Sequence, residues 1–127
     1  MDASLNNAAV LPGFAPDGSL LAPTPIVELD DVSCDNELYV KRDDLIPFSF
    51  GGNKARIAQC FFADAFAQGC NAIVAYGSTR SNLARVMANG AARMGMPCVV
   101  VSPDEADGSR PRSFNAELCA RLGAQVH

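Results

Sequence analysis

Two short stretches of the sequence combine residue types that can carry out chemistry on a small molecule. The first is Gly51-Gly52-Asn53-Lys54, in which a primary amine follows two glycines. Glycines allow a tight turn and the close approach of a ligand, and Asn53 can cap a helix that starts at Lys54. The positive end of that helix disfavours a charged amine and favours its neutral, nucleophilic form. These residues suit Lys54 as a catalytic nucleophile. The alternative is an ordinary solvated lysine at a helix start.

The second stretch is Gly77-Ser78-Thr79-Arg80-Ser81-Asn82, which follows an apolar run and precedes a helical pattern. Free backbone amides at a helix N-terminus bind anions, and the side chains of Ser78, Ser81 and Asn82 add short polar groups. The stretch predicts a site for a carboxylate or a phosphate. It contains neither GxGxxG nor GKS or GKT, so it is not a dinucleotide or P-loop fingerprint. An ordinary serine- and asparagine-rich helix cap is the alternative.

The remaining polar residues do not support a metal site or histidine-based catalysis. Asp43-Asp44 has no third ligand at a typical spacing, and His127 is the only histidine. The five cysteines are odd in number, widely spaced and without a CxxC pair, which favours reduced thiols over a disulfide framework or a zinc site. We therefore expect a cytoplasmic protein with no bound metal.

Composition and charge narrow the class of protein further. The chain has 127 residues, 49% hydrophobic and 19% charged, which suits a folded domain and not a disordered chain. Residues 1–50 carry nine acidic and two basic residues, whereas residues 51–127 carry five acidic and eight basic ones. An acidic protein without a Lys/Arg cluster is not expected to bind nucleic acid, and no long apolar run predicts a membrane span. The basic second part suits a small anionic ligand.

The elements that must position the two polar stretches alternate between strand and helix patterns. Strands are predicted at 38–42, 72–76, 98–101 and from 124, and helices from 54 to about 68, from 81 to 94 and from 111 to 122. This alternation predicts an α/β fold with an open, mainly parallel sheet and flanking helices. Ligands in such sheets bind beyond the carboxyl ends of strands, which is where both polar stretches are expected to begin.

Apolar side chains of these elements are expected to form the core. Phe61, Phe62 and Phe66 recur on one face of the first predicted helix. Residues 72–76 form a short apolar run that is typical of a buried strand. Tyr76 is accordingly expected to be a core residue and not a catalytic acid.

Four segments, taken in order, resemble a known enzyme family. They are PTPI at 23–26, LYVKRDD at 38–44, GGNKAR at 51–56 and GSTRSN at 77–82. They resemble the N-terminal part of the 1-aminocyclopropane-1-carboxylate deaminase / D-cysteine desulfhydrase family. Its members belong to the tryptophan-synthase-β-like, fold type II class of pyridoxal-phosphate enzymes, which have two domains. The resemblance covers about residues 23–127, and GGNK followed by the spaced Ser-Asn loop is its most specific part.

The resemblance implies a pyridoxal-phosphate-dependent lyase or deaminase that acts on a small amino acid. Such an enzyme opens a ring or eliminates a β-substituent, and it releases a 2-oxo acid and ammonia. Lys54 would form the Schiff base with pyridoxal 5′-phosphate and shuttle a proton, and Asn53 and Asn82 would bind the cofactor. The substrate would be bound by Ser78, Ser81, Asn82 and Leu83. Some relatives have a phosphate-binding lysine in place of Ile57, and Arg80 and Leu83 replace residues that are often polar, which implies a different substrate.

Members of this family are much longer than 127 residues, so the chain is expected to be a truncated N-terminal portion of a two-domain enzyme. The expected parts are an irregular arm at 1–22, the start of the large cofactor domain at 23–53 and a truncated small-domain segment at 54–127. A homodimer is implied for the full-length form. The alternative is a non-catalytic α/β module that binds an anionic metabolite or needs a partner chain to complete its sheet.

Overall fold

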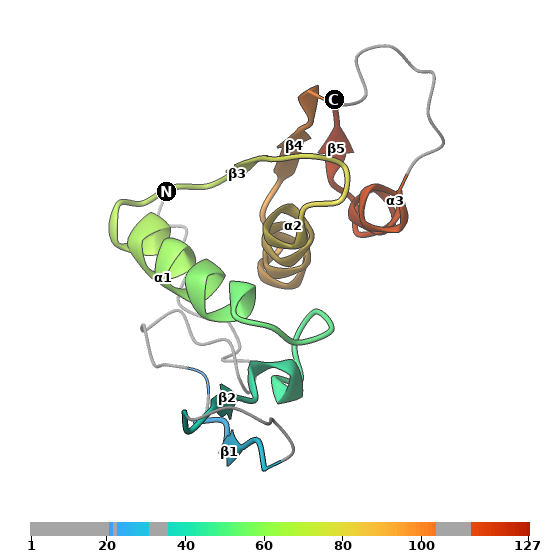
Figure 1. Ribbon diagram of the computed structural model, residues 1–127. Helices are drawn as coiled ribbons and strands as arrows, with labels where there is room; N and C mark the ends of the chain where they lie inside the picture. The colour runs from blue at the N-terminus through green and yellow to red at the C-terminus, as the bar shows by residue number, and fades with distance from the viewer. Residues whose placement is uncertain (1–20, 22, 31–35, 104–112) are drawn as a thin grey trace.

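The computed structural model describes residues 21, 23–30, 36–103 and 113–127, which form two small sheets and several helices (Figure 1). In chain order the elements are β1 (Ile26–Glu28), β2 (Tyr39–Lys41), the 3-10 helix η1 (Asp43–Leu45), α1 (Lys54–Ala67), β3 (Ile73–Tyr76), α2 (Asn82–Met94), β4 (Cys98–Val101), α3 (Phe114–Arg121) and β5 (Gln125–Val126). Strands β3, β4 and β5 pair in that order in a parallel sheet. The predicted α/β class is confirmed. No helix in the described ranges is long and apolar enough to cross a membrane.

The first predicted strand lies in a different sheet from the others. β2 pairs in antiparallel fashion with β1, with Ile26 opposite Lys41, and this pair forms its own two-stranded sheet. The sequence patterns missed β1, because three residues directly after a proline are too short to show a strand period. The parallel βα alternation therefore begins at β3 and not at residue 38. As a consequence, the loop before Lys54 does not leave the edge of the parallel sheet.

Helices α2 and α3 lie on one side of the parallel sheet, and α1 packs against α2 (Figure 1). Along β3 the side chains alternate, so that Ile73 and Ala75 are buried whereas Val74 and Tyr76 are 72% and 71% exposed. The prediction of a fully buried strand with Tyr76 in the core is therefore wrong. A strand in a parallel sheet is buried on both faces only when helices cover both, and the helices described here cover one.

The contact between α1 and α2 depends on one glycine. Phe62 of α1 is 1% exposed, and its ring fills the space next to Gly90 of α2, where an added Cβ would lie 2.4 Å from the ring. Phe66 is partly buried, whereas Phe61 is 54% exposed, so the prediction that Phe61 belongs to the core is wrong. One residue along a helix turns the side chain by about 100°, which carries Phe61 off the stripe that buries Ala58 and Phe62.

Local signals fix most of the helix ends. The helices are followed by glycines with positive φ, as is common at helix C-termini: Gly69, Gly95 and Gly123. Ser81 and Ser113 are the N-caps directly before α2 and α3, and each hydroxyl accepts a backbone N–H three residues later. The predicted ends of α1 and α2 are confirmed to within a residue. Helix α3 begins at Phe114, and the predicted start at Pro111 lies outside the described residues.

Candidate functional site

Lys54 is the first residue of α1 and follows a turn of left-handed backbone. The φ angles of Ser49, Phe50, Gly51 and Gly52 are 50°, 64°, 73° and 93°. Only glycine adopts this region without cost, so Ser49 and Phe50 hold strain of about 1–2 kcal/mol each. The Lys54 side chain is half-buried, and within the described residues its amine forms no hydrogen bond or ion pair. The amine is therefore available to a ligand.

Asn53 does not cap α1 with its side chain, contrary to the sequence-based prediction. Its backbone is already helical, with φ −61° and ψ −19°, and its side chain makes no capping hydrogen bond. Side-chain capping requires an extended residue at this position, so the left-handed turn that precedes Asn53 removes the geometry for it. The Asn53 carbonyl accepts the N–H groups of Arg56 and Ile57, while the side chain is exposed.

The N-terminus of α2 has the donors expected of an anion site. Ser81 Oγ accepts the N–H of Ala84 at 3.2 Å, which caps the helix. Within the described residues, the backbone N–H groups of Asn82 and Leu83 form no hydrogen bond, so they are free helix-terminal donors. Gly77 permits the tight approach of the loop, because a Cβ there would lie 2.9 Å from Ser81 Oγ. An anion placed at this end of α2 would meet these donors.

The N-terminus of α3 holds the same loop in place. Asn115 Nδ2 donates to the carbonyl of Arg80 at 2.9 Å and to Asn82 Oδ1 at 3.2 Å. The Ser113 hydroxyl donates to the carbonyl of Thr79. Sequence reasoning missed both α3 residues. Ser113 could have been found as a helix cap, whereas the contact of Asn115 depends on the fold and leaves no local signal.

The loop before Lys54 also reaches the first turns of α2 and α3. The ring of Phe50 lies 6.1 Å from the ring of Phe114, and 5.3 Å from the guanidinium carbon of Arg85. Figure 1 shows this loop, between η1 and α1, beneath the ends of α2 and α3. The structure thus brings the turn that carries Lys54 and the loop at 77–82 to the same helices. In the described part of the chain no hydrogen bond joins Lys54 directly to that loop.

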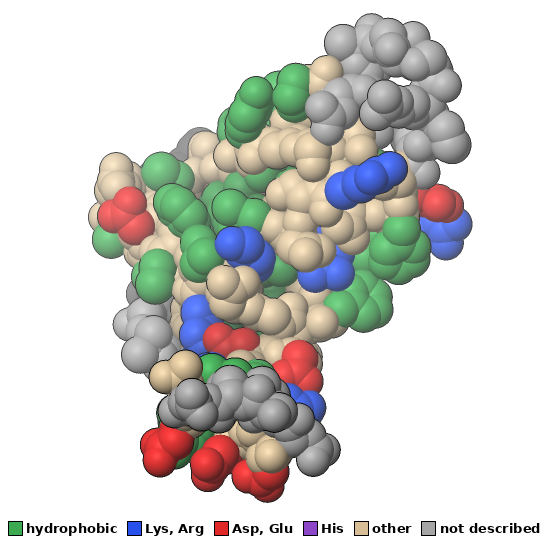
Figure 2. All heavy atoms as spheres, viewed as in Figure 1, with side chains coloured by type: hydrophobic (Ala, Val, Ile, Leu, Met, Phe, Trp, Pro, Cys, Tyr) green, Lys and Arg blue, Asp and Glu red, His purple; other side chains and the backbone are tan. Residues whose placement is uncertain are grey.

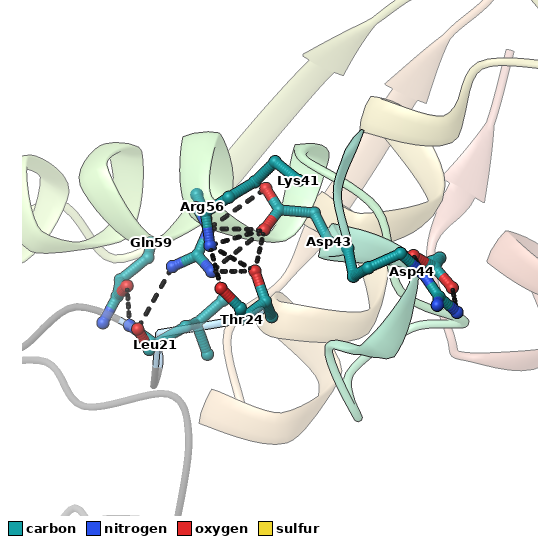
Figure 3. Close-up of polar contacts among 8 residues, drawn as sticks. Leu21, Thr24, Lys41, Asp43, Asp44, Arg56 and Gln59 are labelled. Atoms are coloured by element: carbon teal, nitrogen blue, oxygen red, sulfur yellow. Dashed lines mark hydrogen bonds and ion pairs between the residues drawn. The ribbon is translucent and has the colours of Figure 1, made fainter. Parts of the chain in front are cut away.

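A polar network fixes the first turn of α1 to the N-terminal segment (Figure 3). The Arg56 guanidinium donates to both carboxylate oxygens of Asp43 and to the carbonyl of Leu21, with the shortest contact at 3.0 Å. Thr24 Oγ1 donates to Asp43 at 2.6 Å, and the Lys41 ammonium lies 3.8 Å from the same carboxylate. Asp43 is therefore engaged by cations of the protein itself, and no cluster of metal-ligating side chains occurs among the residues described.

This network lowers the pKa of Asp43 to about 2, chiefly through the hydrogen bonds from Arg56 and Thr24. The unfolded chain has a carboxyl pKa of about 3.9, so the stabilisation is present above that value and is lost as the pH falls towards 2. We expect Asp43→Asn to flatten the loss of stability between about pH 4 and pH 2. Urea unfolding at several pH values measures this. Asp44→Asn is the comparison variant and is expected to change the pH dependence less, because exposed Asp44 pairs with Arg42 alone among the described residues, and this pairing lowers its pKa less than the network lowers that of Asp43. An unchanged pH dependence in Asp43→Asn would contradict the assignment.

The side chain of Leu83 lies among apolar residues, which limits what it can contribute to ligand binding. A hollow of about 180 Å³ is lined by Phe61, Val74, Ala75, Tyr76, Leu83 and Met87. The side chain of Leu83 therefore contacts apolar neighbours, and only its backbone amide is a polar donor for a ligand.

Charge is separated along the molecule, as the sequence indicated. Figure 2 shows acidic side chains gathered over the end formed by β1 and β2, and basic side chains around the helices. The exposed acids of that end include Glu28, Asp30 and Glu37. Basic side chains around the helices favour anionic ligands there.

The sequence matches a protein-family model and curated enzymes of known activity. The family model described as "Pyridoxal-phosphate dependent enzyme" matches residues 19–127. D-cysteine desulfhydrases of Salmonella paratyphi B and Salmonella newport are each 39% identical over 82 residues, which is 63% of this chain and 25% of those proteins. The chain therefore spans about a quarter of the length of these relatives.

Solved structures show the same relationship. A crystal structure of an ACC deaminase homologue has a TM-score of 0.71 and 29% identity, covering 84% of this chain and 32% of that one. O-ureido-L-serine synthase gives a TM-score of 0.62 and 27% identity over 82% of this chain and 32% of its own. A hydrogen sulfide-producing enzyme from Fusobacterium nucleatum gives a TM-score of 0.59 and 26% identity, over 81% of this chain and 33% of its own. The resemblance drawn from the four sequence segments is confirmed, and this chain belongs to the pyridoxal-phosphate-dependent enzyme family.

Proposed function

We propose that this chain forms the lysine-bearing part of a pyridoxal-phosphate-dependent lyase or deaminase that acts on a small amino acid. The half-buried Lys54 amine, unpaired within the described residues at the start of α1, carries this proposal. The finer reaction, ring opening or β-elimination with release of a 2-oxo acid and ammonia, is supported by similarity to D-cysteine desulfhydrases and to an ACC deaminase homologue.

The residues present fit pyridoxal phosphate and an amino-acid substrate. When bound, the cofactor supplies an electron sink for bonds broken at the substrate. Lys54 would hold it covalently and then take up or return a proton at Nζ. The amides of Asn53 and Asn82 would hydrogen-bond the polar groups of the cofactor.

The substrate carboxylate would be bound at the N-terminus of α2. The backbone amides of Asn82 and Leu83 are free donors in the described part of the chain. Ser81 Oγ already accepts the cap hydrogen bond, which leaves its proton for the carboxylate. The exposed hydroxyl of Ser78 would complete the set.

The division of the chain into parts also belongs to this proposal. We assign residues 1–22 to an arm, residues 23–53 to the start of the large cofactor domain and residues 54–127 to the small domain. The separation of the β1–β2 pair from the parallel β3–β4–β5 sheet supports a boundary near Lys54. The homodimer and the cytoplasmic location stay predictions for the full-length form.

Reconstitution with pyridoxal phosphate tests the role of Lys54. The chain has only two lysines, Lys41 and Lys54, and the Lys41 ammonium already donates to the carbonyl of Thr24 at 2.6 Å. After borohydride reduction, peptide mapping is expected to find the pyridoxyl group on Lys54. Lys54→Ala is expected to lower the adduct yield at least 100-fold.

The matched control is Lys41→Arg, which keeps a positive charge beside Asp43 and is expected to form the adduct as the wild type does. Labelling of Lys41 to the same extent as Lys54, or an adduct that persists in Lys54→Ala, would contradict the assignment. No adduct in the wild type would favour a non-catalytic module that binds an anionic metabolite.

A further inference from the structure

Arg85, in the first turn of α2, is a buried cation. It is 8% exposed, and its Nε has no hydrogen-bond partner among the residues that the structure describes. Within the described residues it forms no ion pair, and burial lowers the pKa of its guanidinium, with the thiol of Cys119 as the nearby titratable group. A buried guanidinium without a carboxylate needs another favourable contact. The residue that supplies this contact therefore explains how the buried charge of Arg85 is stabilised.

The ring of Phe50 supplies this contact. The guanidinium carbon of Arg85 lies 5.3 Å from the ring centroid, within the range of a cation–π interaction, which is strongest when the cation is desolvated. Phe50 itself has an unusual combination of properties, with a φ of 64° and a side chain that is 71% exposed. A bulky residue keeps a strained backbone only where its surroundings hold it. Arg85 and the ring of Phe114, whose centroid lies 6.1 Å from that of Phe50, provide those surroundings.

A second pair shows how the loop lies along α2. The guanidinium carbon of Arg93, in the last turn of the helix, is 5.8 Å from the centroid of the Phe48 ring. The two aromatic residues flank Ser49, and the two arginines lie two turns apart on α2. Arg93 is exposed whereas Arg85 is buried, so Arg85 is the better desolvated of the two cations.

We propose that Arg85 and Phe50 are positioning residues, whose stacking fixes the left-handed turn at 49–52 and thereby the place of Lys54 relative to the N-terminus of α2. On the other side the turn is held by backbone hydrogen bonds, from Gly51 to Phe48 at 3.0 Å and from Gly52 to Asp43 at 2.6 Å. The stack is a side-chain contact that links this turn to the helix presenting the anion donors. This inference rests on the proposed function of Lys54.

Hydrogen exchange of the full chain tests whether the stack holds the turn. Arg85→Lys keeps the charge and removes the planar guanidinium, and Phe50→Leu removes the ring at an exposed position where folding is not threatened. Both are expected to speed amide exchange in peptides covering 49–54 at least tenfold, with β4 unchanged. Phe50→Tyr keeps a ring and is expected to restore the wild-type rate. The controls are Arg121→Lys and Phe61→Leu, at exposed residues outside the stack.

A second measurement links the turn to the lysine. The yield of the reduced pyridoxyl adduct on Lys54 is followed as a function of pyridoxal phosphate concentration. The half-saturating concentration is expected to rise at least tenfold in Arg85→Lys and Phe50→Leu, and to stay at the wild-type value in Phe50→Tyr and the controls.

The outcomes separate the inference from the function on which it rests. Unchanged exchange at 49–54, or faster exchange spread evenly over the chain, would overturn the inference. Faster local exchange with unchanged half-saturation at Lys54 would also overturn it, because the turn would then not position the amine. Absence of a Lys54 adduct in the wild type would instead overturn the proposed function, and the inference would fall with it.

Discussion

Replacing Gly51 with alanine is expected to destabilise the fold by about 2–5 kcal/mol, through backbone strain and a steric overlap together. The φ of Gly51 is 73°, a region that alanine rarely adopts. In addition, a Cβ at this position would lie 2.3 Å from the carbonyl oxygen of Asp44. That atom belongs to the backbone of η1, so it cannot move without displacing the 3-10 helix. Urea unfolding of the variant and the wild type measures the loss.

The neighbouring glycine offers a matched control for this prediction. Gly52 has a φ of 93°, and a Cβ there would meet no atom of the described residues within 4 Å. Gly52→Ala is therefore expected to show the strain without the overlap, and to be less destabilising than Gly51→Ala by about 1–3 kcal/mol. Equal losses in the two variants would mean that η1 gives way easily, and would contradict the prediction.

Gly90→Ala is expected to destabilise the protein by about 1–3 kcal/mol through overpacking, although the same change inside an ordinary helix would stabilise it. The added Cβ would lie 2.4 Å from Cε2 and 2.8 Å from Cζ of Phe62. Phe62 is 1% exposed, so its ring cannot turn away into solvent. Thermal and urea unfolding of the single variants give the cost of each change.

A double-mutant cycle distinguishes this overlap from a general effect on the helix. Phe62→Leu shortens the side chain and removes the ring atoms that meet the new Cβ, so Gly90→Ala is expected to cost less in that background. The two changes should therefore be non-additive by about 1 kcal/mol or more, as expected for residues in contact. Additive losses would show that Gly90 and Phe62 do not share the space between α1 and α2.

Features encoded by neighbouring residues could be predicted from the sequence. The serine that caps α2 and the glycine at its end are local signals, and the end of α1 at Gly69 follows the same rule. The parallel alternation from residue 73 onwards also follows from strand and helix periods that lie within each element. The family resemblance needed only the order and spacing of four short segments.

Features that depend on distant contacts could not be predicted in this way. The exposure of Phe61 and Tyr76 depends on which faces of α1 and β3 the rest of the fold covers, and not on their own apolar character. The contact of Phe50 with Arg85 joins segments that share no sequence pattern. The missing side-chain cap at Asn53 has a local cause, because the left-handed turn before it sets its backbone conformation. That turn has four consecutive positive φ values, and two of its residues are not glycine, so the sequence carries no reliable signal for it.

The order of strands in the parallel sheet has a consequence for how the site forms during synthesis. β3, β4 and β5 are neighbours in space in the order of the chain. During synthesis, each new strand can therefore pair with a strand that has already left the ribosome. The turn before Lys54 cannot form its contacts so early. Its partner Arg85 emerges with α2, and Phe114 only with α3. The lysine is therefore among the first residues of the site to be made, and its turn is among the last parts to be completed.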